Sequence, residues 1–374
     1  MRTGLRRIAE TTRVSGPLWT ASLVLDRALP VGVLGMWPDV RVEPARLRRQ
    51  LEAVLRAWGM PEETAAATAG HVLYADLHGI DSHGAAMLMS YHRRLGAGQL
   101  DPRATAEVVR DGPSTALVDG GGGLGHVPAE TAMRLAIEKA RANGIAAVAV
   151  RNSGHFGAAG AYASMAAEAG LIGMATTNVL EPAVVPTFGR EPKLGTNPIA
   201  FAAPARRNRP FLLDMATSAA SLGQAVVAWR KGRSIPTGWA IDASGRPVTN
   251  GRAAAEGRRL LPLGSTRTMG SHKGYGLATA VEILSSVLSG GDTVGHFTMA
   301  LDPAAFEAGF DERMDALLDD LRATRPLGDA AVMAAGDPER QAAAERERDG
   351  IPLARAVVED IRHVAAAAGA EFLL

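Results

Sequence analysis

The chain places a hydroxyl beside an imidazole in Asp81-Ser82-His83-Gly84, where an apolar, alanine-rich stretch gives way to a glycine-flanked bend. Histidine exchanges protons near neutral pH, and a neighbouring hydroxyl can relay or orient that proton. A second element of this kind, Asn152-Ser153-Gly154-His155-Phe156-Gly157, follows 72 residues later. Two glycine-framed Ser/His elements in one chain indicate acid–base chemistry on a small molecule.

Glycine distinguishes His83 and His155 from most of the nine histidines, which we interpret as structural or solvated. Glycine permits tight turns and lets a ligand approach the backbone closely. Residues 157–160 follow His155 at an expected helix start, where backbone N–H groups could bind a pyrophosphate. His272-Lys273-Gly274 adds a cation at another expected helix start. For His83 and His155, a loop histidine bonded to the backbone is the alternative interpretation.

A glycine-rich segment has the pattern of a dinucleotide fingerprint. Residues 120–125 satisfy G-x-G-x-x-G between an expected strand and an expected helix, which is the context that such a fingerprint requires. The next strand should then end in Asp or Glu to bind the ribose, yet Arg151 follows Val150. An arginine could contact a 2′-phosphate instead, but so glycine-rich a segment matches the pattern easily by chance. We therefore interpret it as a flexible turn.

A metal site is a further alternative for the first element. His78, Asp81 and His83 form the pattern His-x-x-Asp-x-His, whose ligand types suit a transition metal. No expected helix holds these three side chains in a fixed arrangement around a metal ion, so a metal-dependent hydrolase is the minor alternative. Polar residues also follow apolar stretches at 194–198 and 214–218, as expected for the walls of a pocket.

The elements that must position these residues follow from apolar periodicity. Helical spacing predicts helices over 47–58, 61–77 and 85–95, so that residues 81–84 lie at a junction between helices. Strands and helices then alternate, which indicates an α/β sheet domain. The expected strands are 115–118, 145–150, 171–176, 199–203, 211–213 and 297–301, and the expected helices are 128–142, 157–169, 275–288 and 306–321. We expect the apolar helix 275–288 to be buried and the end of the chain to pack on the N-terminal helices.

Bulk composition limits the function classes. Of the 374 residues 47% are apolar, as in globular proteins, and 40 basic against 39 acidic residues give no basic surface for nucleic acid. Cysteine is absent, which excludes disulfides, thiolate metal sites and a cysteine nucleophile and favours a cytoplasmic location. No apolar run approaches the length of a membrane span. We expect residues 1–39 to be a disordered extension, with a targeting peptide as the alternative.

Taken together, five segments resemble the type-2 malate/L-lactate dehydrogenase family, which includes sulfolactate and ureidoglycolate dehydrogenases and piperideine-2-carboxylate reductases. The resemblance runs from about Val42 to the end of the chain, and the order and spacing of the segments make it specific. The segments are Asp-Leu-His-Gly-Ile-Asp-Ser-His-Gly (76–84), Asn-Ser-Gly-His-Phe-Gly (152–157), Gly-Thr-Asn-Pro (195–198), Asp-Met-Ala-Thr-Ser (214–218) and His-Lys-Gly-Tyr-Gly (272–276).

The resemblance implies reversible hydride transfer between NAD or NADP and a 2-hydroxy or 2-oxo acid. It also implies an α/β fold in which a non-Rossmann NAD(P)-binding sheet domain is flanked by a helical module built from the N- and C-terminal parts. The chain would divide into an extension (1–39), a helical N-terminal module (40–115), a cofactor- and substrate-binding domain (116–300) and a C-terminal segment packed on the helical module (301–374). Family members are homodimers, so we expect a homodimer that binds a small acid and neither nucleic acid nor membrane.

The matching motifs imply roles for single residues. His83 resembles the acid–base residue at the substrate oxygen, with Ser82 as its relay, and His155 resembles the second active-site imidazole. Thr196 resembles a substrate contact, and Met87 occupies a substrate position where many members carry a carboxylate-binding arginine. The residues that resemble cofactor contacts are His155, Phe156, Gly157, Ala158, Ala159, Asn178, Asp214, Met215, Ala216, His272, Lys273 and Gly274. No residue is expected to bind a metal.

Three departures from the family pattern bear on the substrate. Met87 replaces the arginine, which together with Met89 predicts a 2-oxo acid that is bulkier or more apolar than those of malate or lactate. Gln224 stands where many relatives have a lysine or an aspartate, and the loop that follows Gly291 is short. A catalytically inactive member that serves as a binding protein is therefore an alternative to an active enzyme.

Overall fold

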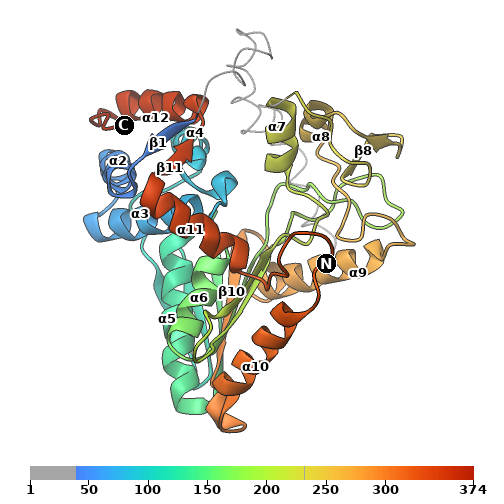
Figure 1. Ribbon diagram of the computed structural model, residues 1–374. Helices are drawn as coiled ribbons and strands as arrows, with labels where there is room; N and C mark the ends of the chain where they lie inside the picture. Colours follow the sequence, from blue (N-terminus) through green and yellow to red (C-terminus); the bar gives the residue numbers. More distant parts are fainter. Residues whose placement is uncertain (1–38, 231) are drawn as a thin grey trace, which may run out of the picture.

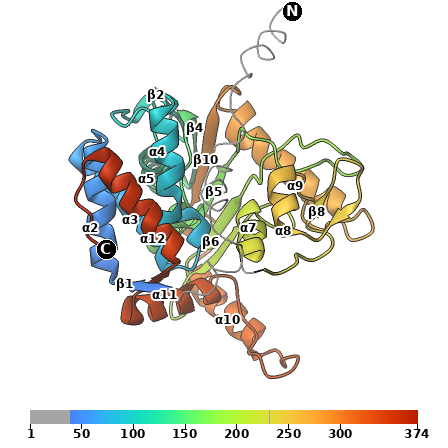
Figure 2. The ribbon, with the colours of Figure 1, turned by 90° about the horizontal axis from the view of Figure 1, so that it is seen from above.

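The computed structural model describes residues 39–230 and 232–374, so the predicted extension lies outside the described residues apart from Asp39. Helices from both ends of the chain form one part of the molecule, and a central sheet forms the second (Figure 1). A smaller unit carries α7 (Leu222–Arg230) and α8 (Gly251–Gly257). Viewed from above, the sheet lies between the helical part and the side that carries α7 and α8 (Figure 2).

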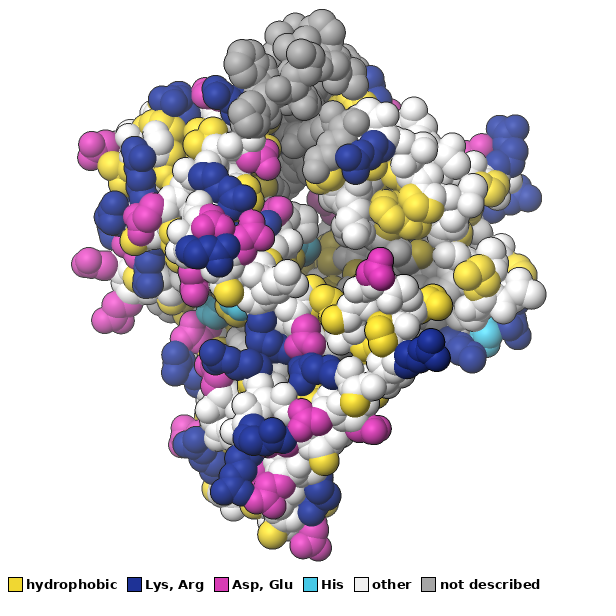
Figure 3. Space-filling model, in the orientation of Figure 1, with side chains coloured by type: hydrophobic (Ala, Val, Ile, Leu, Met, Phe, Trp, Pro, Cys, Tyr) yellow, Lys and Arg dark blue, Asp and Glu magenta, His cyan; other side chains and the backbone are white. Residues whose placement is uncertain are grey.

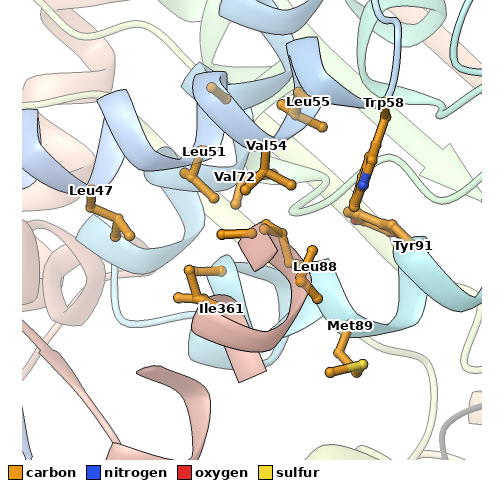
Figure 4. Close-up of a cluster of buried hydrophobic side chains, with 14 of the residues drawn as sticks. Leu47, Leu51, Val54, Leu55, Trp58, Val72, Leu88, Met89, Tyr91 and Ile361 are labelled. Atoms are coloured by element: carbon orange, nitrogen blue, oxygen red, sulfur yellow. The ribbon is translucent and has the colours of Figure 1, made fainter. Parts of the chain in front are cut away.

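The helical part joins segments that are far apart in the sequence. It contains α2 (Pro44–Ala57), α3 (Glu62–Leu77), α4 (Leu88–Gly96) and α12 (Arg355–Ala368). The Glu43 carboxylate caps α2 by accepting the amides of Ala45 and Arg46, which leaves fewer unpaired donors at its start. One apolar core holds side chains of all four helices, among them Leu47, Leu51, Val72, Leu88 and Ile361 (Figure 4). Beside them β1 (Val40–Val42) pairs antiparallel with β11 (Ile351–Leu353).

The first two predicted helices are confirmed, whereas the third begins differently. After α3 the chain runs through two 3₁₀ turns, η3 (Asp81–His83) and η4 (Ala85–Met87), before α4 begins at Leu88. The predicted junction between helices at residues 81–84 is therefore confirmed, and it is a sharp turn rather than a loop.

The central sheet has seven strands in the order β2-β3-β4-β10-β5-β6-β7. Among the pairs described, only β3 and β4 run parallel, and every other neighbour in this sheet is antiparallel. The strands are β2 (Glu107–Asp111), β3 (Thr115–Asp119), β4 (Ile145–Ser153), β5 (Ile172–Thr177), β6 (Ile199–Ala203), β7 (Phe211–Met215) and β10 (Val294–Leu301). The six predicted strands are thus present, and β2 was not predicted because its side chains are all exposed.

Two helices pack on the sheet beside α3. They are α5 (His126–Asn143) and α6 (Gly160–Glu168), whose small residues Ala129, Ala132, Ala163 and Ala166 bury completely against the strands. The predicted start of α6 at Gly157 is wrong by three residues. Gly157 has a φ of +78°, which is incompatible with a right-handed helix, so residues 157–159 remain a turn.

The smaller unit was not predicted as a separate structure. Besides α7 and α8 it contains the short strands β8 (Ala240–Ile241) and β9 (Pro247–Val248) around a small core that includes Val184, Ala225 and Leu260. It touches the helical part at η3, because a Cβ atom on Gly223 would lie 3.1 Å from the Cβ atom of Ser82. The Ser82–His83 turn therefore lies where the helical part meets the smaller unit.

The remaining helices follow the smaller unit. They are α9 (Ser271–Glu282), the π-helical turn η5 (Ile283–Val287), the 3₁₀ turn η6 (Pro303–Ala305), α10 (Phe310–Ala323) and α11 (Asp337–Asp349). The prediction that residues 275–288 are buried is wrong at the end of that segment, where Ile283, Val287 and Leu288 are 52%, 65% and 59% exposed. No helix among the described residues is long and apolar enough to cross a membrane. Acidic and basic side chains mix over the face seen in Figure 3.

Candidate active site

The fold brings the two Ser/His elements together. His83 lies at the end of η3, and His155 lies just beyond the end of β4. Their rings are stacked with 5.3 Å between centroids and 26° between planes. Both rings are only partly buried, so a small molecule can reach them.

Ser82 and His83 form a hydrogen-bonded pair. The Ser82 hydroxyl lies 2.8 Å from Nδ1 of His83, and Ser82 is exposed. Burial lowers the pKa of His83 to about 4. The ring is therefore neutral at pH 7 in the free protein, and with Nδ1 held by the hydroxyl its Nε2 is the atom left for a ligand.

A buried carboxyl holds the turn that carries this pair. Asp76, on the last turn of α3, is 1% exposed, and its Oδ2 accepts the amide of Ala85 at 2.7 Å. A Cβ atom on Gly84 would lie 1.9 Å from Oδ1 of Asp76, so only glycine allows this contact. Arg346 of α11 donates to the Asp76 carbonyl at 2.6 Å and pairs with Asp81. Both sides of the Ser82–His83 turn are thus fixed by neighbouring helices.

The hydrogen bonds of His155 define its tautomer. The Gly157 amide lies 3.3 Å from Nδ1 and can only donate, so Nδ1 is an acceptor. The Tyr91 hydroxyl, 2.7 Å from the same atom, must then donate as well. Burial, and after it the neighbouring His83 and Arg94, lowers the pKa of His155 well below its usual value. His155 is consequently a neutral imidazole that carries its proton on Nε2.

Tyr91 and His126 are two members of this site that the sequence did not single out. Tyr91 is the eighth residue after His83, and its contact with His155 depends on the turn through η4, which periodicity does not reveal. His126 is fully buried at the start of α5, 6.0 Å from Tyr91 and 6.4 Å from His155 between ring centroids. Neither of its ring nitrogens has a hydrogen-bond partner among the described residues. Burial, and after it neighbouring histidines, lowers its pKa well below the usual value, so this ring is neutral as well.

The segment after His155 is packed into the protein. Phe156 is buried between His296 and Tyr162, with ring centroids 4.6 and 4.9 Å away, and Ala158 and Ala159 are buried as well. The first amide of α6, that of Gly160, donates to Oδ2 of Asp214 at 2.7 Å. A protein carboxylate therefore takes the helix start for which we expected a pyrophosphate.

The Asp214 segment lies beside this helix start. Burial raises the pKa of Asp214 to about 6, although its hydrogen bond from Gly160 acts in the opposite direction. Met215 and Ala216, which follow it at the end of β7, are partly exposed. Asp214 is partly exposed like these two residues, but its carboxylate is already bound to Gly160, so Met215 and Ala216 are the less committed groups of this segment.

A buried amide network begins at Asn197, the residue after Thr196. Asn178 is 2% exposed, and its side chain accepts the Gly295 amide at 2.8 Å and donates to Glu282 at 3.3 Å. Asn197 donates to the same carboxylate at 2.8 Å. Thr196 itself is partly exposed. The side chain of Asn178 is thus committed to the protein, while Thr196 is open to a ligand.

The start of α9 suits an anionic group. His272 and Lys273 are exposed in its first turn, which contains no acidic residue, and no side chain caps this helix. The amides of Ser271 and Lys273 already donate to the carbonyls of Thr266 and Gly270, so the helix dipole and the exposed lysine are what favour a phosphate here. Gly274, in contrast, is buried. It packs so closely on Leu263 that a Cβ atom at this position would lie 2.1 Å from the Leu263 carbonyl oxygen. Residues 272 and 273 therefore fit a phosphate-bearing cofactor, and Gly274 serves the packing of the helix.

Three of the sequence hypotheses change with the structure. Met87 is partly buried beside the helical core, whereas Met89 lies inside that core and does not line the site (Figure 4). Gln224 is exposed and accepts the Ser221 amide at 2.8 Å, as the cap of α7. The loop 120–125 packs closely on residues 152–154, and Arg151 pairs with Asp119 at 2.9 Å rather than standing free.

The residues of the metal hypothesis are not grouped as a metal site in the described structure. Nδ1 of His78 lies 2.8 Å from the Tyr74 carbonyl, and Asp81 pairs with Arg346. Within residues 39–230 and 232–374, no three histidine, aspartate or glutamate side chains are grouped so that they could hold a metal ion.

Comparisons with known proteins match almost the same part of the chain as the sequence motifs, from about Val42 onward. A family model described as malate/L-lactate dehydrogenase matches residues 42–362. The malate dehydrogenase of Pyrococcus horikoshii is 40% identical over 351 residues, which cover 89% of this chain and 97% of that protein. The L-sulfolactate dehydrogenase of Methanocaldococcus jannaschii is 35% identical over 341 residues, or 86% and 96% of the two chains. A crystal structure of malate dehydrogenase from Entamoeba histolytica matches with a TM-score of 0.86 at 31% identity, covering 90% of this chain and 100% of that one.

Proposed function

Because this chain belongs to the malate/L-lactate dehydrogenase family and is a hydroxyacid dehydrogenase, we propose that the stacked His83–His155 pair is its acid–base centre. The proposed reaction interconverts a 2-hydroxy acid and a 2-oxo acid with NAD or NADP. The observation that carries the proposal is the stacking of two neutral imidazoles, each with Nδ1 held by a hydroxyl.

His83 is the proposed base in the direction of oxidation. The substrate hydroxyl gives its proton to Nε2 of His83, while the Ser82 hydroxyl orients the ring through Nδ1. A free-protein pKa of about 4 is low for a base, but an anionic substrate beside the ring favours its charged form and raises the pKa. In the direction of reduction the same atom returns the proton.

His155 is the proposed donor to the substrate oxygen. Its Nε2–H can donate a hydrogen bond to the carbonyl of the 2-oxo acid and so stabilise negative charge on that oxygen. The Tyr91 hydroxyl and the Gly157 amide hold the required tautomer. Because His155 stays neutral, it polarises the oxygen without competing with His83 for the proton.

The cofactor supplies the hydride acceptor or donor when it is bound. We place the nicotinamide beside His155 and the partly exposed residues Met215 and Ala216, and the phosphates near His272 and Lys273. Buried members of the predicted set, Phe156, Ala158, Ala159 and Asn178, would shape this site from behind rather than touch a ligand. The single parallel strand pair favours a non-Rossmann mode of binding.

We propose a substrate that is bulkier or more apolar than malate or lactate. Met87, which stands where a carboxylate-binding arginine is common in this family, supports the idea, and Thr196 is the proposed second contact. Residues 116–300 would form the cofactor- and substrate-binding domain, residues 40–115 and 301–374 the helical surround, and two chains a cytoplasmic homodimer.

Steady-state reduction of a panel of 2-oxo acids with NADH and NADPH tests the proposal. The panel contains pyruvate, oxaloacetate, 4-methyl-2-oxopentanoate and phenylpyruvate. We expect turnover with at least one cofactor and the highest kcat/KM with one of the two bulky acids. A preference for pyruvate or oxaloacetate would refute the substrate proposal, and cofactor binding without any turnover would identify an inactive binding protein.

A further inference from the structure

An arginine whose side chain has no partner in the described part of the chain lies on α4, the helix that borders the imidazole pair. Among the residues that the structure describes, the Arg94 guanidinium forms no hydrogen bond and no ion pair, and its side chain is partly buried. A partly buried cation gains most from an anionic partner, because nearby protein displaces part of its hydration. No carboxylate of residues 39–230 and 232–374 pairs with Arg94, so a bound anion is the natural partner.

The geometry of α4 turns Arg94 toward the site. Met87, Tyr91 and Arg94 are spaced i, i+4 and i+7, so they lie along one face of the helix. Tyr91 on this face contacts His155 at 2.7 Å. Helical side chains lean toward the N-terminus, and the N-terminal end of α4 follows directly from His83 and Met87. The guanidinium therefore reaches back from the end of the helix toward the imidazole pair.

The neighbouring positions belong to a different face. The ring of His92 lies 6.5 Å from that of His363 on α12. Burial lowers the pKa of Arg93, and the charge of Asp360 on the same α12 opposes this shift. Residues 92 and 93 thus face α12, which makes Arg93 a matched control for its neighbour.

The charge of Arg94 affects the pKa values of His155 and Tyr91. After burial and His83, it is the next cause that lowers the pKa of His155. It also opposes the rise that burial causes in the pKa of Tyr91. The field of this guanidinium is therefore felt at the two groups that the proposed reaction uses.

We propose that Arg94 binds the carboxylate of the 2-oxo or 2-hydroxy acid, as the cation that Met87 does not supply; this rests on the proposed function. A guanidinium can hold a carboxylate through two parallel hydrogen bonds. Residues 87 and 94 are about 10 Å apart along the helix axis, at 1.5 Å per residue. With its carboxylate drawn toward the far end of α4, the acid leaves the Met87 side of the pocket for an apolar substituent. Arg94 is thus a specificity-determining residue for long or bulky 2-oxo acids.

The substitution Arg94→Met, with Arg94→Lys and Arg93→Met beside it, tests this role. With 4-methyl-2-oxopentanoate we expect R94M to raise KM about 30-fold or more while kcat changes less than about 3-fold, because substrate and transition state both keep the carboxylate. The KM of R94K should lie between those of the wild type and R94M, since lysine keeps the positive charge but cannot form the two parallel hydrogen bonds of a guanidinium. R93M should stay within about 2-fold of the wild type. The wild type should also prefer the acid over its methyl ester, and R94M should lose this preference.

A binding measurement separates this inference from the reaction itself. Calorimetric titration of 4-methyl-2-oxopentanoate into protein saturated with oxidised cofactor gives an affinity without turnover. Weaker binding to R94M, with wild-type binding by R93M, supports the carboxylate site even if no acid is turned over and the proposed reaction fails. Equal affinity and equal KM in R94M and the wild type overturn it. A comparable loss in R93M also overturns it, because the effect would then belong to the packing of α4.

Discussion

Asp76 is a buried carboxyl whose charge state depends on pH in the neutral range. Burial raises its pKa from 3.8 to about 7, with the Ala85 amide acting in the opposite direction. Between these values the folded protein retains a proton that the unfolded chain has lost. The contribution of Asp76 to stability is therefore greatest below about pH 4, falls as the pH rises to 7 and is constant above it. Each pKa unit corresponds to about 1.4 kcal/mol, so burying the charged form costs roughly 4 kcal/mol.

The substitution Asp76→Asn should remove this dependence. Asparagine can still accept the Ala85 amide through its side-chain oxygen, but it carries no charge at any pH. We expect the difference in unfolding free energy between D76N and the wild type to shift by about 2–3 kcal/mol in favour of the variant from pH 5 to pH 8. Urea denaturation at the two pH values measures it. The control is Glu63→Gln, which changes an exposed carboxyl on the same helix. If the difference in unfolding free energy between D76N and the wild type changed with pH as little as that of E63Q, the raised pKa of Asp76 would be contradicted.

The helix α11 positions the Ser82–His83 turn from the other end of the chain. Arg346 donates to the Asp76 carbonyl at 2.6 Å and pairs with Asp81, which precedes the proposed catalytic pair Ser82–His83. Arg346→Met should lower kcat/KM about 10-fold, because the turn loses one of its two fixed sides, and should lower stability by about 1–2 kcal/mol. Kinetics together with thermal unfolding measure both effects. Arg348→Met on the same helix removes only an exposed pair with Asp349, so equal losses in the two variants would rule out a specific role.

The elements show what sequence can and cannot predict. Periodicity predicted α2 and α3 closely because Leu47, Leu51 and Val54 mark a continuous apolar face. It missed the unit around α7 and α8, whose core is small and assembled from distant segments such as Val184 and Leu260. The end of the predicted helix 275–288 became the π-turn η5, with an exposed apolar face that no periodicity distinguishes from a buried one.

The candidate site was predictable in its motifs but not in its contacts. Glycine neighbours singled out His83 and His155, and the fold stacks their rings. Tyr91, and Arg94 as the proposed carboxylate contact, carry no local signal, because their positions depend on how α4 lies against the segment that follows β4. Asn178 and Phe156 matched cofactor motifs, yet both are buried. A motif thus identifies a functional segment, whereas burial decides which of its side chains can meet a ligand.

At the scale of the whole molecule, the proposed site draws on separate parts of the chain. His83 comes from the helical part, His155 from the sheet, and Lys273 from α9 beyond the smaller unit. A cofactor that contacts all of them binds only the folded protein, and at 100 times its Kd it should stabilise that state by about 2.7 kcal/mol. We expect NADH or NADPH to raise Tm by roughly 3–4 °C. Lys273→Gln should reduce this rise by weakening the phosphate contact, while Lys193→Gln, which removes an exposed lysine paired with Glu191, should not. Thermal unfolding with and without each cofactor measures the shift in Tm. If neither cofactor raised Tm, the chain would lack the cofactor that its proposed reaction needs. If Tm rose equally in the two variants, the phosphates would not bind at the start of α9.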